Sequence, residues 1–347
     1  MSEASLRLHF GGPDLPARCL RNLLQDRIAQ VPLGGEIAWT TYYLRDRALA
    51  LALMAASDRG VAVTLRIEGA PRFPRVNDTV IAMLEAHGLG GGLKVHRPAG
   101  GFFRSYYPYW HSKIYCFSHP VPTVLVGSFN PSGDEPEDAV ILADIGDQDR
   151  GHNVLVDFEG EAFHRVMATH VRRMGQFGSR LGLSQNRPLK IGETSLWVYP
   201  RLWPGLIDRD LKSLGRGDRV SGAISHLKRG VLADALANAA RRGAAVHLLV
   251  HDTERRVRTE TLAALAEAGV VARRYARADA LPLHAKFLIV ETAGRRQAWL
   301  GSLNFNRRSY WLNHEVLIGS RDPAVIDSLE ERLRTIADEV ALPIIER

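Results

Sequence analysis

The sequence predicts an α/β protein made of two similar lobes. Segments with strand-like alternation are interleaved with segments of helical periodicity along the chain, and this order is typical of α/β layers. One polar motif occurs twice, about half a chain apart, which indicates an internal duplication. With 347 residues, of which 46% are hydrophobic, the chain is long enough to bury a core in each of two domains.

The elements of the first lobe alternate in order. Strands are predicted at 6–10, 36–44, 61–67 and 93–96, and helices at 17–29, 48–59 and 80–87. A helix over 161–174 has an apolar packing face at helical spacing, formed by Phe163, Val166, Met167, Val171 and Met174. The second half repeats the order of strands and helices. We expect an N-terminal lobe over 1–180, a linker over 181–190 that breaks at Pro188, and a C-terminal lobe over 191–347.

The repeated motif is a histidine and a lysine two residues apart, followed by Gly-Ser-x-Asn. The first copy consists of His111, Lys113, Ser128 and Asn130, and the second of His284, Lys286, Ser302 and Asn304. Residues two apart on a strand face the same side, so each histidine projects together with its lysine.

The two halves differ in length ahead of this motif. The segment that begins at Gly34 matches the one at Gly217, and the segment at Asp58 matches the one at Arg241, both at the same offset. The offset from His111 to His284 is shorter than this by ten positions. The first half therefore carries ten extra residues, for which 101–110 is the candidate.

These residue types suit the cleavage of a phosphodiester. Its negative charge repels attacking water, so a site needs donors on the nonbridging oxygens, a nucleophile and a proton for the leaving alkoxide. The two lysines supply positive charge, and the motif serines and asparagines supply neutral donors to the phosphate. One imidazole attacks phosphorus to give a phosphohistidine, and the other acts as acid and then as base. Because one group cannot occupy both sides of an in-line displacement, each lobe contributes half of one site at the seam.

The pair of motifs resembles the phospholipase D superfamily. The segment G-S-L-N-F-N-R-R-S-Y-W-L-N-H-E-V-L-I, from Gly301, resembles its cardiolipin synthase and phosphatidyltransferase branch. The resemblance covers nearly the whole chain and implies two lobes related by a pseudo-twofold axis, each a mixed β-sheet flanked by helices. It also implies that His111 is the nucleophile and that His284 is the general acid and base. Ser118 and Glu291 depart from the pattern, since the family usually has Asp five residues after each lysine.

Each imidazole also needs a partner that holds its tautomer. The matched segments at His152 and His314 place Asn153 in the first copy at the position that Glu315 has in the second. Relatives often use a carboxylate, sometimes from across the lobe boundary, and Glu315 is the candidate here. If Glu315 crosses the boundary it would orient His111, and Asn153 could orient the other ring. The alternative for Glu315 is a solvated carboxylate at a strand end.

The extra segment at 101–110 ends beside His111 and is rich in aromatic residues: Phe102, Phe103, Tyr106, Tyr107, Tyr109 and Trp110. Such rings suit a membrane interface, the stacking of bases of a single-stranded nucleic acid, or packing at the lobe seam. Arg307 and Arg308 follow Asn304 closely, which favours one of them at the site entrance. The predicted substrate-binding residues are Tyr107, Tyr109, Trp110, Asn153 and Arg308.

Charge and composition favour an anionic partner. The net charge is +7 and the sequence pI is near 9.6, which suits nucleic acid or acidic lipid headgroups. The 13 histidines show no metal-ligand spacing such as H-E-x-x-H, so we expect neither a metal nor a cofactor. Only Cys19 and Cys116 occur, no signal-like segment begins the chain, and no apolar run is long enough to span a bilayer. We expect a cytoplasmic monomer that contacts the inner face of the membrane.

The sequence therefore favours a phospholipase D-type phosphodiesterase or phosphatidyltransferase that acts on phospholipids, similar to cardiolipin synthases and independent of metal. The alternative enzyme is a nuclease of the same superfamily that cleaves DNA or RNA. The alternative of another class is an inactive nucleic-acid-binding or membrane-binding module, against which both intact His-Lys pairs argue. Hydrolysis or transfer depends on whether water or an alcohol reaches the intermediate.

Overall fold

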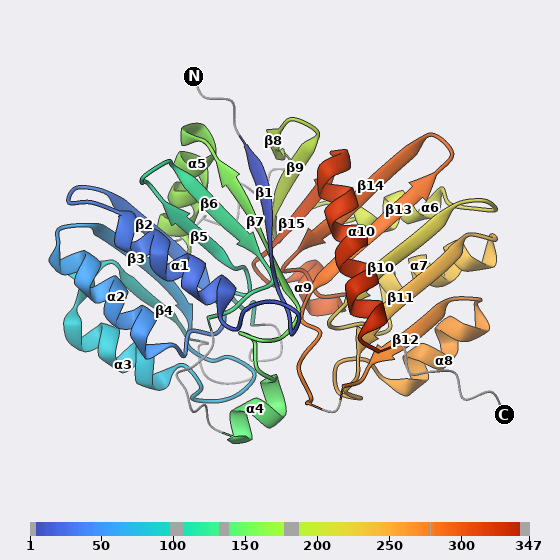
Figure 1. Cartoon of the computed structure of the whole chain (residues 1–347), viewed down its shortest axis with the longest axis horizontal. Helices are drawn as coiled ribbons and strands as arrows, with labels where there is room; N and C mark the ends of the chain where they lie inside the picture. The colour runs from blue at the N-terminus through green and yellow to red at the C-terminus, as the bar shows by residue number, and fades with distance from the viewer. Residues whose placement is uncertain (1–4, 98–106, 132–138, 177–186, 278, 341–347) are drawn as a thin grey trace.

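Two β-sheets lie side by side (Figure 1). One core of buried side chains contains residues of both sheets. The computed structural model describes residues 5–97, 107–131, 139–176, 187–277 and 279–340. Phe102, Phe103 and Tyr106 of the aromatic segment therefore lie outside the described residues, as do residues 181–186 of the predicted linker.

The first sheet has seven strands in the order β1-β7-β6-β5-β2-β3-β4. They are β1 (Leu6–Gly11), β2 (Glu36–Thr41), β3 (Ala62–Glu68), β4 (Leu93–His96), β5 (Ile114–Phe117), β6 (Thr123–Gly127) and β7 (Asn153–Glu159). Strands β2, β3 and β4 pair in parallel, and the other pairings are antiparallel. The sheet is therefore mixed, as the resemblance implies.

Helices cover both faces of this sheet because its buried strands alternate between two cores. Along β2, Ile37 and Trp39 join the core beneath α1 (Cys19–Gln30), α2 (Arg47–Asp58) and α3 (Asp78–His87). Ala38 points the other way, into the core that contains α5 (Glu161–Arg173). The Asp46 carboxylate caps α2 by accepting a hydrogen bond from the Leu49 amide at 2.8 Å.

The second sheet has eight strands in the order β12-β11-β10-β13-β14-β15-β9-β8. They are β8 (Leu189–Ile191), β9 (Thr194–Tyr199), β10 (Arg219–Ile224), β11 (Ala245–His251), β12 (Val271–Tyr275), β13 (Lys286–Thr292), β14 (Arg295–Gly301) and β15 (Glu315–Ser320). Its parallel strands β10, β11 and β12 correspond to β2, β3 and β4, and β9 takes the place of β1. Both lobes thus have one topology, which confirms the predicted fold class.

The remaining helices complete the second lobe and the seam: α4 (Ala139–Ile145), α6 (Ile207–Lys212), α7 (Val231–Arg241), α8 (Thr259–Glu267), α9 (Arg307–Trp311) and α10 (Pro323–Asp338). Helix α10 follows β15 as α5 follows β7, and both helices contribute to one core that also holds strand residues of both sheets (Figure 1). Shared apolar side chains therefore hold the two lobes together at the seam.

The elements of the first lobe lie where their sequence patterns place them. The helix predicted over 161–174 is α5, and its Phe163, Met167 and Val171 are buried. Residues Leu189 and Lys190, the end of the predicted linker, begin β8. The boundaries of the lobes at 1–180 and 191–347 stay a prediction.

Within the described ranges, no helix combines the length and the apolar character that crossing a membrane requires.

Candidate active site

Two matched pairs of backbone hydrogen bonds join the lobes at the ends of the histidine motifs. The amide of His111 donates to the carbonyl of His314 at 3.1 Å, and the amide of His284 donates to the carbonyl of His152 at 2.9 Å. In return, the amide of His314 donates to Tyr109 and that of His152 to Pro282. Each bond in the first lobe thus has a counterpart in the second, as a pseudo-twofold axis requires.

Both motif histidines face one cavity between the lobes. The cavity has a volume of about 530 Å³, and its lining includes His111 and Asn130 from the first lobe and His284 and Asn304 from the second. The two imidazoles are nearly buried, with exposed fractions of 8% and 6%. The duplicated sequence therefore builds one site at the seam, with a matching histidine and asparagine from each half.

Glu315 crosses the seam to hold the first imidazole. Nδ1 of His111 lies 2.9 Å from Oε2 of Glu315, and the carboxylate is fully buried. Burial raises the pKa of Glu315, but the neighbouring His111 and Lys113 together lower it by more than burial raises it. The pKa therefore lies below its ordinary value. An ionised carboxylate only accepts hydrogen bonds, so Nδ1 of His111 carries the proton and Nε2 keeps its lone pair.

Asn153 holds the second imidazole in the matching way. Nδ1 of His284 lies 2.9 Å from Oδ1 of Asn153. The amide nitrogen of Asn153 donates to the carbonyl of Gln148 at 3.0 Å, which identifies Oδ1 as the acceptor. The proton of the His284 ring therefore lies on Nδ1 as well. The two histidines differ in one respect: a carboxylate orients His111, and a neutral amide orients His284.

The motif serines support these orienting residues. Ser128 donates to Oδ1 of Asn153 at 3.0 Å and accepts from the amide of Val154. Ser302 donates in the same way to Glu315 and accepts from the amide of Val316. The sequence predicts that both hydroxyls hold the phosphate directly. The structure differs because β7 and β15 bring the orienting side chains within reach of the hydroxyls, which therefore act behind the histidines.

The motif lysines are buried beside the histidines that they follow. Nζ of Lys286 donates to the carbonyl of His284 at 2.6 Å, and Nζ of Lys113 makes the same contact with His111. Burial lowers the pKa of Lys113 to about 7, and Glu315 partly opposes this shift. Burial also lowers the pKa of Lys286 well below its ordinary value, and repulsion by Lys113 and Arg256 adds to it.

The histidine pKa values follow the same physics. Burial lowers the pKa of His111 to about 4, although Glu315 opposes the shift. The pKa of His284 lies well below its ordinary value because of burial, Lys286 and Arg256. An anion in the cavity would reverse these shifts by stabilising the charged forms. The electrostatics of the cavity therefore favour a negatively charged ligand.

The asparagines of the two motifs line the cavity itself. Oδ1 of Asn130 accepts a hydrogen bond from the amide of Tyr43 at 3.3 Å. Oδ1 of Asn304 is buried and has no hydrogen-bond partner within the described part of the chain. Both residues are thus placed to contact a ligand between the histidines.

Seven cationic residues also line the cavity: Arg72, Lys228, Arg229, Arg255, Arg256, Arg307 and Arg308. Sequence reasoning pointed to Arg307 and Arg308 and missed the other five. Arg72 and Arg255 stand at the same offset as the matched segments at Gly34 and Gly217, and this repeat could have identified them. Tyr42, whose ring lies 4.8 Å from that of His111, was also missed.

The predicted aromatic residues have different surroundings. Tyr109 lines the cavity, and the guanidinium of Arg308 lies 4.9 Å from the centre of its ring. Tyr107 and Trp110 are buried and stack on His96 at 4.5 and 4.4 Å. His96 belongs to β4, so this stacking is packing within the first lobe, and Trp110 also reaches the seam through a backbone bridge to His314. The role of Tyr107 and Trp110 in substrate binding stays a prediction.

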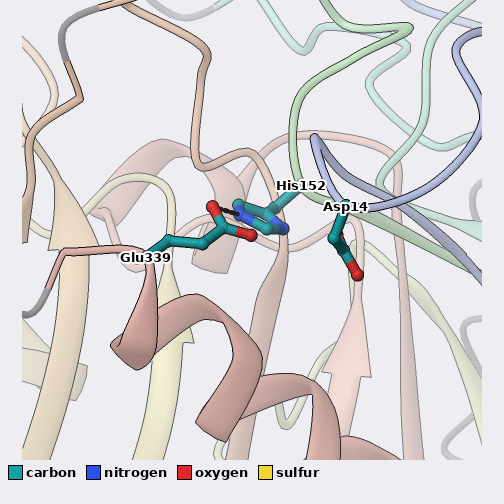
Figure 2. Close-up of side chains that lie close together, drawn as sticks. All are labelled: Asp14, His152 and Glu339. Carbon is teal, nitrogen blue, oxygen red and sulfur yellow. Dashed lines mark hydrogen bonds and ion pairs between the residues drawn. The ribbon is translucent and has the colours of Figure 1, made fainter.

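Asp14, His152 and Glu339 form the one cluster of three potential metal ligands among the described residues. Figure 2 shows the Glu339 carboxylate on one side of the His152 ring and Asp14 on the other. The guanidinium of Arg332 donates to both oxygens of Asp14, at 2.7 and 2.8 Å, and to Nδ1 of His152 at 2.7 Å. Because Arg332 already binds Asp14 and His152, and Arg277 binds Glu339 at 3.0 Å, the cluster does not suit a metal ion. It is a clasp between the lobes.

Comparison with known families identifies the second lobe. Residues 216–337 match a family model described as cardiolipin synthase, PLD-like domain. This range includes His284, Lys286, Ser302, Asn304 and Glu315. A search of curated proteins finds no match.

Solved structures share the fold of the whole chain. The phosphatidylserine synthase of Haemophilus influenzae Rd KW20 has a TM-score of 0.63 at 13% identity, over 96% of this chain and 86% of that one. The polyphosphate kinase of Porphyromonas gingivalis has a TM-score of 0.59 at 16% identity, over 95% of this chain. The chain spans about half of that kinase, 47%. At these identities the likeness shows the two-lobed fold alone.

Proposed function

Because the chain belongs to the phospholipase D superfamily, with a cardiolipin synthase-type domain at 216–337, we propose that it is a phosphodiesterase or phosphatidyltransferase that acts on phospholipids. The reaction passes through a covalent phosphohistidine and uses no metal. The observation that carries this proposal is the single cavity with two imidazoles whose Nδ1 atoms are both engaged. Each ring therefore has its Nε2 atom available for the reacting groups.

His111 is the nucleophile in this proposal. When its Nε2 bonds to phosphorus, the imidazole becomes cationic, and the buried carboxylate of Glu315 stabilises that charge at 2.9 Å. His284 has only the neutral Asn153 as its partner. The difference between a carboxylate and an amide favours the first ring as the one that carries the covalent bond.

The first step transfers the phosphatidyl group to the enzyme. The lone pair on Nε2 of His111 forms a bond to phosphorus, while the bond from phosphorus to the alcohol oxygen breaks. The electron pair of that bond stays on the oxygen, which takes a proton from Nε2 of His284. His284 must therefore enter this step as an imidazolium. The negative charge of the bound phosphate favours that form, against the burial and the neighbouring cations that oppose it.

The second step releases the product. His284, now neutral, takes a proton from an incoming alcohol or water, and the oxygen of that molecule bonds to phosphorus. The bond from phosphorus to Nε2 breaks, and its electron pair returns to His111. An alcohol gives transfer and water gives hydrolysis. Lys113, Lys286, Asn130 and Asn304 stabilise the nonbridging oxygens in both steps.

Ser128 and Ser302 act as positioning residues, since their hydroxyls donate to Asn153 and Glu315. Both halves of the site lie in one chain, so we propose that a monomer completes it.

The test measures turnover of labelled phosphatidylglycerol and of single- and double-stranded DNA, all in the presence of EDTA. The His111→Ala protein is the control for contaminating activity. The proposal expects lipid turnover that EDTA leaves unchanged and that the control lacks. Cleavage of DNA without turnover of lipid would replace the phospholipid proposal with the nuclease. Lipid turnover that EDTA abolishes would contradict the metal-independent mechanism.

A further inference from the structure

We infer that the leaving alcohol carries a second phosphate, and that in transfer the acceptor alcohol does too. Lys228, Arg229 and Arg307 hold this phosphate at the rim of the second lobe. This inference rests on the proposed function and names the substrate class more closely: a phospholipid whose headgroup alcohol is itself phosphorylated.

The charge of the cavity is greater than one phosphodiester requires. Seven cationic side chains line it, and no carboxylate is among its lining residues in the described part of the chain. Lys113 and Lys286 lie beside the histidines, where the buried Glu315 carboxylate offsets part of their charge. A phosphodiester carries a single negative charge. The surplus indicates a ligand with more than one anionic group.

Three of these side chains differ from the others in having no anionic partner within the described part of the chain and in being exposed. Asp144 neutralises Arg72 and lies 3.6 Å from Arg255, and Arg256 donates to the carbonyl of Ile145 at 2.6 Å. Lys228, Arg229 and Arg307 have no ion-pair partner in the ranges that the structure describes, and all three are exposed. Their positive charge is therefore available to a ligand.

The duplication provides an internal comparison for this rim. The offset in the sequence that relates Arg72 to Arg255 also relates Asp46 to Arg229. Asp46 is buried, binds Arg21 at 2.8 Å and caps α2. The first lobe thus has a neutralised carboxylate where the second lobe has an exposed cation. The surplus positive charge belongs to one side of a nearly symmetric cavity.

The rim also has room beside it. A second cavity, of about 140 Å³, shares Lys228, Arg229, Asn306 and Arg307 with the catalytic cavity and continues toward Trp311. A group that extends from the reacting phosphorus past His284 would meet these cations.

The rim cations lie on the same side of the cavity as His284, and this position assigns the second phosphate to the alcohol part of the substrate. In an in-line displacement the leaving oxygen departs opposite His111 and receives its proton from His284. His284, Lys228, Arg229 and Arg307 all belong to the second lobe. The leaving alcohol therefore extends over this rim, and in transfer the acceptor alcohol takes its place.

The test compares two lipids that differ in one group: phosphatidylglycerol, and phosphatidylglycerol with a phosphate on its terminal hydroxyl. The measured quantity is the ratio of their kcat/KM values. We expect the phosphorylated lipid to be favoured by about tenfold or more, since two or three charge-assisted contacts separate the substrates. In the Arg229→Gln/Arg307→Gln protein this ratio falls by at least about fivefold. The matched control, Arg165→Gln on the exposed side of α5, keeps the ratio of the native protein.

A binding measurement separates this inference from the proposed function. The His111→Ala protein, titrated with glycerol 3-phosphate and with glycerol, should bind the phosphorylated alcohol more tightly, and the two rim substitutions should remove the difference. Such binding without turnover of either lipid would overturn the proposed function and leave the rim as an anion site. Equal kcat/KM values for the two lipids, a preference that survives the rim substitutions, or cleavage of DNA in place of both lipids would overturn the inference.

Discussion

Nδ1 of His111 in the first lobe lies 2.9 Å from Oε2 of Glu315 in the second, a residue 204 positions later in the chain. The matching contact of His284 ends on the amide oxygen of Asn153, again at 2.9 Å and again across the seam. Each half of the site is therefore oriented by the other lobe. This arrangement makes the closed pair of lobes, rather than either lobe alone, the catalytic unit.

Replacement of Glu315 by Gln should lower kcat by about 100-fold or more, because the phosphohistidine at His111 loses the carboxylate that stabilises it. Steady-state kinetics measure the effect, and the thermal unfolding midpoint shows whether the fold is intact. Ser302→Ala is the graded control, since it removes only the hydrogen bond behind the carboxylate. A kcat within about threefold of the native value would remove Glu315 from the mechanism.

Replacement of Asn153 by Asp should extend activity to higher pH. The pKa of His284 lies well below its ordinary value because of burial, Lys286 and Arg256, and a carboxylate at 153 would raise it. Since the acid form of His284 protonates the leaving oxygen, a higher pKa keeps that form populated at higher pH. The measurement is the alkaline limb of the kcat profile, with Asn153→Ser as the uncharged control. A limb that does not move, or that moves to lower pH, would contradict this role.

Acid should destabilise the fold through its buried histidines. Burial lowers the pKa of His111 to about 4 and that of His251 to about 4, whereas an unfolded chain has a histidine pKa near 6.5. The unfolded state therefore binds protons first as pH falls, so the free energy of unfolding decreases from about pH 6.5 down to about pH 4. Urea unfolding at several pH values measures the slope. His111→Asn should reduce the slope, and an equal slope in that variant would contradict the lowered pKa.

The clasp shown in Figure 2 should raise the free energy of unfolding. Arg332→Met leaves Asp14 and Nδ1 of His152 without their shared donor, and we expect a loss of about 1–3 kcal/mol in the free energy of unfolding. The control is Arg334→Met, an exposed position two residues further along α10. Equal stability of the two variants would contradict the clasp.

The clasp also adjoins the second histidine, since His152 accepts a backbone hydrogen bond from His284 and precedes Asn153. We therefore expect Arg332→Met to lower kcat more than it raises KM, because the position of the acid changes while the cationic cavity remains.

Much of the site could be predicted because the duplication supplies its own alignment. Two copies of His-x-Lys and Gly-Ser-x-Asn fix which residues are equivalent, and the need for two imidazoles at one phosphorus places them at a seam. The aligned positions 153 and 315, together with the resemblance to a known superfamily, identify Glu315 as the candidate partner of an imidazole. Which ring it orients depends on whether it crosses the seam, and the structure places it against His111. The strands of the first lobe were also predictable, since strand-like segments alternate with segments of helical periodicity along the chain.

The contacts that depend on distant backbone could not be predicted. The role of the serine hydroxyls is set by which side chains β7 and β15 bring beside them, and the sequence of the motif does not contain that information. The clasp joins positions 14, 152, 332 and 339, whose proximity arises only when β1, α10 and the seam are assembled. An aromatic residue such as Trp110 suits a membrane interface or a protein core equally well, and only its burial against His96 and its bridge to His314 show that it packs inside the protein.

The most direct test of the central claim is to trap the covalent intermediate. Phosphatidylglycerol labelled at its phosphorus is mixed with the His284→Asn protein, quenched, digested and mapped by mass spectrometry. The account predicts a phosphoramidate on Nε2 of His111, formed slowly because its acid is missing, and no label in the His111→Asn protein. Label on His284 in the His111→Asn protein, or on neither ring in any variant that still turns over lipid, would contradict it.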